Sequence, residues 1–102
     1  MILAAIASTG AAAAADIVAA AAGLRVVVHK IEFSVSAAAS VKIHFGTAGA
    51  TTNLVNLGFL AANAGAVLEF PGGYVGPTNT ALKLTTDAGN ITGTLYYTKS
   101  QD

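Results

Sequence analysis

The stretch that decides the fold is residues 24–45, which read LRVVVHKIEFSVSAAASVKIHF. Apolar and polar residues alternate in both of its halves, as expected of half-buried antiparallel strands rich in β-branched and aromatic side chains. Small residues at 36–40 separate the two halves, so the pattern predicts a β-hairpin. Its apolar residues are Val27, Ile31, Phe33 and Val35 in the first half, and Val41, Ile43 and Phe45 in the second.

Side-chain parity restricts the register of this predicted hairpin. Phe33 must face an apolar residue of the second half if one side of the strand pair is to stay apolar. Glu32 then lies on the polar side, opposite Lys42 or His44. Opposite charges that face each other across strands contribute about 0.2–1 kcal/mol. The predicted hairpin therefore indicates an architecture, and it indicates no activity.

The rest of the chain also divides into short strands separated by turns. Proline lacks a ladder donor and glycine is conformationally free, so the PGGYVGP segment at 71–77 is expected to leave the sheet. With about eight strands, the chain is predicted to be all-β: one antiparallel β-sandwich, jelly-roll-like. The expected strands beyond the hairpin cover 55–59, 66–70, 82–84 and 91–98; turns are expected at 61–65 and 87–90, long loops at 46–53 and 71–80, and an exposed polar tail at 99–102.

The alanine-rich residues 1–24 admit four interpretations. A signal peptide would need a positive residue before Arg25, and none is present. A transmembrane helix would place Asp16 near the bilayer centre, which costs about 2.5–3.5 kcal/mol. A soluble helix has good propensity here but only two large side chains to anchor it. The fourth interpretation is two short strands joined by a turn at 8–10, the first from Ile2 to Ala7 and the second through Asp16 to Ala21.

Composition limits the partners of the chain. The 102 residues form one domain by length, their net charge is zero, and only 10% of them are charged. Nucleic-acid binding draws on clustered Lys and Arg, and membrane-surface binding on a basic face, so neither is expected. The absence of cysteine excludes disulfides and thiolate metal sites. A sparsely charged, near-neutral surface favours association, so the composition suits a subunit of an assembly.

Side chains capable of catalysis or metal binding are few. His29 has the parity of the core-facing residues and His44 the opposite parity, so the two rings are expected on different sides of the sheet. We expect His29 to contact a backbone carbonyl, and His44 to be solvated or paired with Glu32. Ser34 shares a strand face with Glu32 but has no nucleophile elbow or oxyanion loop. Glu32 and Glu69 are both interpreted as outward residues of strands, not as paired catalytic carboxylates. No catalytic, cofactor or metal site is predicted, and the chain is predicted not to be an enzyme.

Two tyrosines remain as candidates for ligand contact. Tyr74 and Tyr96 could form a stacking platform for sugars, whereas Tyr97 has the parity of the core. They could equally line the rim of a subunit interface, where tyrosine is enriched. The charge-poor composition favours the interface.

Three segments from Arg25 onward resemble small phage virion proteins, in particular capsid decoration (cement) proteins and related head or tail accessory proteins. They are GLRVVVHKIEFSVSAAASVKIHFGTAG at 23–49, LGFLAANAGAVLEFPGGYVGP at 57–77 and ALKLTTDAGNITGTLYY at 81–97. The resemblance implies a β-sandwich or jelly-roll domain, typically a trimer on an icosahedral shell that ties neighbouring capsomers together. It also favours the two-strand interpretation of residues 1–23, as opening strands or an arm, although alanine stands there in place of the more usual Ser, Thr and Val.

The sequence therefore predicts a single domain over residues 1–102 that acts as a structural virion protein. Its expected partners are the major capsid protein, on the outer surface of a phage head, and copies of itself in a homotrimer. The alternatives are a phage tail, baseplate or head-fibre module, and a carbohydrate-binding sandwich. Contacts are expected from the N-terminal strand and the loops at 46–53 and 71–80. The predicted interface residues are Ile2, Leu3, Ile6, Tyr74, Val75 and Tyr96.

Overall fold

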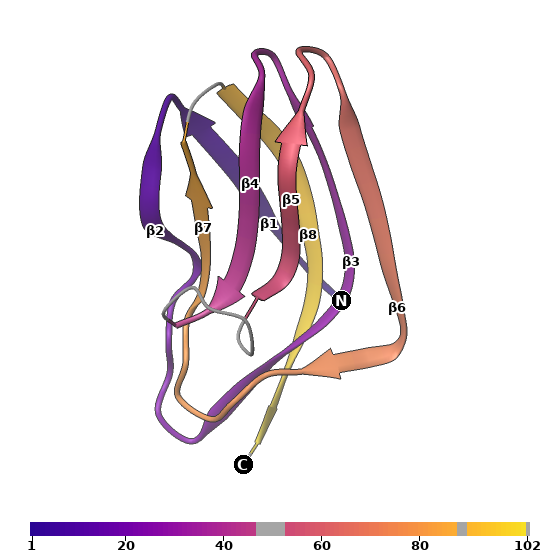
Figure 1. Ribbon diagram of the computed structural model, residues 1–102. Helices are drawn as coiled ribbons and strands as arrows, with labels where there is room; N and C mark the ends of the chain where they lie inside the picture. Colours follow the sequence, from indigo (N-terminus) through magenta and orange to yellow (C-terminus); the bar gives the residue numbers. More distant parts are fainter. Residues whose placement is uncertain (47–52, 88–89, 102) are drawn as a thin grey trace.

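The computed structural model describes residues 1–46, 53–87 and 90–101, which form β-strands joined by turns (Figure 1). Within these ranges there is no helix, and so none that could cross a membrane. The eight strands are β1 (Ile2–Thr9), β2 (Ala12–Val18), β3 (Leu24–Val35), β4 (Ala39–Phe45), β5 (Asn53–Leu60), β6 (Gly65–Val75), β7 (Leu82–Thr86) and β8 (Asn90–Gln101).

The strands build two four-stranded sheets that face each other. One sheet has the order β1-β8-β3-β6 and the other β2-β7-β4-β5, and every neighbouring pair is antiparallel. Most connections pass from one sheet to the other, and only β4 and β5 are consecutive strands paired within a sheet. This is the strand order of a jelly roll. The predicted all-β sandwich of about eight strands is confirmed.

The predicted hairpin of residues 24–45 is wrong. β3 pairs with β8 and β6, whereas β4 pairs with β5 and β7, so the two strands lie in opposite sheets. Phe33 is in register with Gly93 and Ala66, and Glu32 does not face β4. In the sandwich, the apolar face of each strand packs against the opposite sheet. Strands packed in this way show the same alternation of apolar and polar residues as the strands of a half-buried hairpin. Parity therefore identified the buried faces and not the partners.

A β-bulge at His29 shifts the alternation within β3. The β3 register jumps between Val28 and Lys30 against both of its neighbours. Before the bulge, Val26 and Val28 belong to the packed core cluster, whereas the predicted Val27 is buried but lies outside that cluster. After it, Ile31, Phe33 and Val35 face inward as predicted. The extra residue accounts for the difference, because it moves every preceding side chain to the other face.

The core fills the space between the two sheets, with both sheets contributing large side chains. The residues with almost no exposed surface include Ile6, Val28, Ile31, Val35, Val41, Ile43, Leu82, Leu84, Ile91 and Leu95. Tyr97 is also buried, as its parity predicts.

The N-terminal residues form two strands, one in each sheet. β1 pairs with β8 along its whole length, and β2 pairs with β7. The turn at 8–10 is present: the Ser8 hydroxyl donates to the Gly10 carbonyl at 2.6 Å, and Gly10 has a φ of 102°. The two-strand interpretation of this segment agrees with the structure, although β2 ends at Val18, earlier than expected.

Two segments expected to leave the sheet rejoin it. Residues 70–73 have no ladder partner, but Tyr74 and Val75 pair with β3 again, so the loop expected at 71–80 is shorter. Residues 99–101 of the expected exposed tail pair with the start of β3, while Lys99 and Gln101 remain exposed. Residues 47–52 of the loop expected at 46–53, and residues 88–89 of the expected turn, lie outside the described ranges.

Candidate functional site

The exposed large apolar side chains gather at one end of the β1-β8-β3-β6 sheet. Among the described residues, six large apolar side chains are exposed: Met1, Ile2, Leu3, Val67, Tyr74 and Val75. The ladder places Ile2, Tyr97, Val28 and Tyr74 in one row across the sheet. Met1, Ile2, Leu3, Tyr74 and Val75 therefore lie at or beside this row, on the two edge strands of the sheet. We call these five residues the apolar end.

Four of the six predicted interface residues belong to the apolar end. Ile6 does not, because alternation along β1 turns it into the core, where it has no exposed surface. A residue with no exposed surface cannot contact a partner, so Ile6 is removed from the predicted interface. Tyr96 lies on the outer face of the sheet, in register with Leu3.

Tyr74 occupies the inner side of β6. Its ring stacks on Phe45 of the opposite sheet with centroids 6.0 Å apart, and meets Phe70 edge-on at 6.1 Å. A side chain at position 76 would collide with the Phe45 ring, so glycine at this position leaves space for Phe45 to stack on Tyr74. Tyr74 and Tyr96 therefore point to opposite sides of the sheet. The platform of Tyr74 and Tyr96, considered as the alternative to a subunit interface, does not form, because the bulge in β3 and the irregular pairing of β6 decide where Tyr74 faces.

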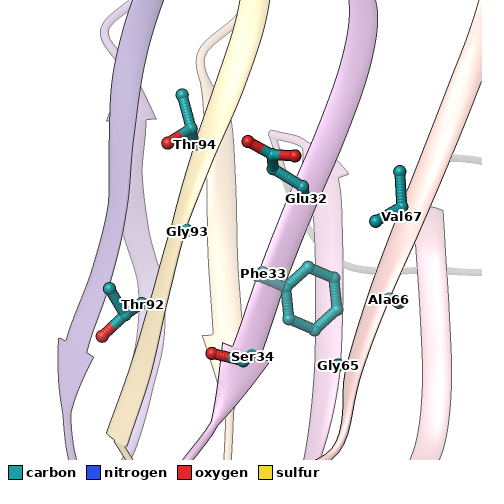
Figure 2. A pocket seen from close by; sticks show the side chains of 9 residues that line it. All are labelled: Glu32, Phe33, Ser34, Gly65, Ala66, Val67, Thr92, Gly93 and Thr94. Carbon is teal, nitrogen blue, oxygen red and sulfur yellow. The ribbon is translucent and has the colours of Figure 1, made fainter.

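A hollow of about 420 Å³ lies on the outer face of the same sheet (Figure 2). Two rows of outward side chains border it. One row contains Thr94, Glu32 and Val67, and the other contains Thr92, Ser34 and Gly65.

The floor of this hollow is backbone, because the row between its borders holds Gly93, Phe33 and Ala66. Phe33 is buried in the core. A Cβ on Gly93 would lie 2.6 Å from the Phe33 Cα, and a Cβ on Gly65 would lie 2.6 Å from the Phe33 carbonyl oxygen. The two glycines thus let β8 and β6 approach the β3 backbone closely. The outer surface of the sheet is therefore depressed at this row.

A network of three side chains borders the hollow. The Tyr96 hydroxyl donates to Glu32 Oε1 at 2.9 Å, and Lys30 Nζ lies 3.7 Å from Glu32 Oε2 and 5.4 Å from the centre of the Tyr96 ring. The hydrogen bond to Glu32 raises the pKa of the Tyr96 hydroxyl, because only the neutral phenol can donate it. Partial desolvation and the Glu32 charge act in the same direction, and the Lys30 charge opposes them. The network holds the Glu32 carboxylate in place while leaving the group at the surface.

A second hollow, of about 430 Å³, lies on the other side of this network. Its lining includes Lys30, Tyr96, Glu69 and His29, and the Pro71-Gly72 kink of β6 forms one wall. The kink forms because β6 leaves the ladder between Glu69 and Tyr74, with Gly72 and Gly73 at positive φ. The two hollows thus lie along one sheet face with the Lys30–Glu32–Tyr96 network between them.

The two histidines have partners other than those expected. His29, the bulge residue, lies within hydrogen-bond distance of the Thr98 hydroxyl, with Nε2 and Oγ1 2.9 Å apart, and not of a backbone carbonyl. His44 is fully buried and does not pair with Glu32, which lies in the opposite sheet. Its Nδ1 donates to the Gly46 carbonyl at 2.8 Å, which leaves Nε2 to accept from the Thr85 hydroxyl at 2.7 Å in the neutral ring. His44 therefore has a structural role.

The groupings considered for catalysis and metal binding do not assemble. Ser34 and Glu32 share the outer face, as the pattern indicates, but His44 belongs to the other sheet. In the ranges 1–46, 53–87 and 90–101, no three His, Asp or Glu residues are placed to hold a metal ion.

Sequence reasoning missed the network and both hollows. Lys30 and Glu32 are two residues apart on one strand, so the sequence alone indicates that they lie on the same face of the sheet. Their contact with Tyr96 depends on β8 lying beside β3, a pairing between segments more than 60 residues apart. Comparison of the chain with models of protein families, with curated protein sequences and with solved structures finds no match.

Proposed function

We propose that the chain is a structural virion protein, a decoration protein that binds the major capsid protein on the outside of a phage head and stabilises contacts between capsomers. The observation that carries this proposal is the apolar end, where five large apolar side chains remain exposed on a domain of 102 residues. Exposed apolar surface that is gathered together marks interaction sites. The charge-poor composition and the resemblance of three segments to decoration proteins support the same role.

The placement of the apolar end also supports self-association as a homotrimer. Ile2 and Leu3 lie on β1 and Tyr74 and Val75 on β6, which are the two edge strands of one sheet. Three strand spacings separate these edges, a distance of about 14 Å. A closed ring of three copies requires each interface to join two different surfaces. The β1 edge of one copy and the β6 edge of the next provide such a pair.

Charged substitutions at the apolar end test the proposal. Leu3 is 61% exposed and Val75 52% exposed, so Leu3→Glu and Val75→Glu leave the core intact. Each should abolish co-sedimentation with heads of the phage that encodes the chain, because a buried unpaired carboxylate is strongly unfavourable at an interface. Val67→Glu is the matched control, since Val67 is 62% exposed but lies outside the apolar end.

Light scattering on the same variants separates self-association from binding to the shell. Each variant alone should lose the trimer mass, whereas an equimolar mixture of Leu3→Glu and Val75→Glu keeps one intact contact and should give a dimer. Equal co-sedimentation of all three variants would overturn the role of the apolar end. A wild-type chain that is a stable monomer and does not co-sediment with heads would favour a tail or baseplate module.

A further inference from the structure

We propose that the outer face of the β1-β8-β3-β6 sheet is a glycan-binding site, formed by the two hollows on either side of the Lys30–Glu32–Tyr96 network. Each hollow, at about 420 and 430 Å³, has the volume of a small-ligand site. The site differs from a platform of Tyr74 and Tyr96, because Tyr74 faces the other way. The inference does not depend on the role in a phage head.

The side chains around the first hollow select the chemical class of the ligand. Three hydroxyl groups, from Ser34, Thr92 and Thr94, and the Glu32 carboxylate border the backbone floor. In Figure 2 the Glu32 carboxylate points away from Val67 toward β8. Hydroxyls that both donate and accept, beside a carboxylate that accepts strongly, match the hydroxyl groups of a sugar. An apolar ligand would leave these groups without partners.

Charge and topology exclude two other classes of ligand. Among the described residues that line the first hollow, Glu32 is the charged one, and its carboxylate disfavours phosphates and other anions there. A peptide strand would need free backbone groups, and the floor of the first hollow over β8 and β3 has none, because both strands have ladder partners on each side; the free backbone groups of β6, the edge strand at the border of the hollow, point away from this floor. Recognition must therefore come from side chains.

The network fixes how the ligand is held. Glu32 already accepts from Tyr96 and is held near Lys30, so its carboxylate is oriented before a ligand arrives and loses little freedom on binding. Val67 offers an exposed apolar surface beside the first hollow, suited to the C–H face of a sugar ring. The central row of the first hollow, at Phe33, and the row of Lys30, which lines the second, are three residues apart along β3, or about 10 Å. A disaccharide bound in the first hollow therefore reaches the network.

Chemical-shift mapping on the ¹⁵N-labelled full chain tests the site. The probes are cellobiose, maltose, lactose and N,N′-diacetylchitobiose, with inorganic phosphate as the anionic probe. We expect saturable shifts from at least one disaccharide, centred on the amides of Glu32, Thr92 and Thr94, and none from phosphate. Glu32→Ala should weaken that binding by about tenfold or more, because it removes the charged acceptor.

Matched variants keep the test independent of folding. Thr92 is exposed, so Thr92→Val should weaken the same disaccharide with the fold unchanged, whereas Asn56→Ala, exposed on the opposite sheet, should leave binding unaltered. The proposal is overturned if none of the four disaccharides gives a saturable shift, or if the shifts are centred elsewhere. Full binding by Glu32→Ala and Thr92→Val overturns it as well. Val75→Glu separates this site from the assembly surface, since Val75 lines neither hollow: the variant should lose binding to heads and keep the disaccharide.

Discussion

Two sets of outward polar side chains, one on each sheet of the sandwich, have opposite surroundings. On the β1-β8-β3-β6 sheet, Lys30, Glu32 and Tyr96 contact one another but stay at the surface beside two hollows. On the β2-β7-β4-β5 sheet, His44 alternates with core residues and points outward, yet it has no exposed surface and both ring nitrogens are hydrogen-bonded within the fold.

The difference shows that neighbours, more than residue type, decide what a polar group does. A polar group with all of its partners inside the domain can stabilise the fold but has nothing left to offer a ligand. A group held at the surface contributes little to stability, because solvent competes for it. The Lys30–Glu32–Tyr96 network on the first sheet therefore has the chemistry for binding, and His44 on the second has the chemistry for structure.

The largest expected effect comes from adding one methyl group to each sheet. A Cβ at Gly93 in the first sheet would lie 2.6 Å from both the Phe33 Cα and its Cβ, while a Cβ at Gly58 in the second meets nothing within 4 Å. Gly93→Ala should lower the free energy of unfolding by about 3 kcal/mol, because β8 must move away from β3. Gly58→Ala should change it by less than about 1 kcal/mol. Urea denaturation of both variants measures the difference, and equal losses would show that the close approach at Gly93 is not what shapes the hollow.

The two histidines provide the next comparison. His44→Ala removes a buried ring and two hydrogen bonds, and should cost about 3 kcal/mol of unfolding free energy. His29→Ala on the first sheet removes one hydrogen bond from a half-buried ring, and should cost about 1 kcal/mol. Thermal unfolding of the two variants side by side checks the order. If His29→Ala is the more destabilising, the outer face of the first sheet is structural and the contrast fails.

Local pattern was sufficient to predict the strands and the buried faces of most of them, and insufficient to predict which strands are neighbours. The alternation at 31–35 and 41–45 depends only on burial, and burial is the same for a hairpin as for two strands packed face to face. The strands that pair with β3 lie far from it along the chain. The entropy cost of closing the loop between two strands changes only slowly with the number of residues between them, so it favours no particular distant partner. Sequence spacing therefore carries little information about them.

The candidate site was harder to predict for the same reason. The apolar end was found in large part, because Leu3 and Val75 are large apolar residues at the ends of segments and local sequence shows this directly. The network was missed, because Tyr96 reaches Glu32 only through the pairing of β8 with β3. His44 was placed in solvent because strand parity separates inner from outer faces, but does not show that Gly46 and Thr85 enclose the ring.

The smallest expected effect is a dependence of stability on alkaline pH, which tests the surface network itself. The hydrogen bond to Glu32 raises the pKa of Tyr96 above the ordinary value of 10.0. Since the folded-state pKa is the higher one, the contact stabilises the fold fully below the unfolded-state pKa, and this contribution is lost as pH rises through the folded-state value. Phenolate absorbance should show one tyrosine with a raised pKa, and Glu32→Gln should lower the pKa of that group. Tyr96→Phe should remove both the signal and its share of the pH dependence of unfolding. If Glu32→Gln leaves the titration unchanged, Tyr96 does not hold the carboxylate, and the first sheet loses the preorganised acceptor on which its contrast with the second depends.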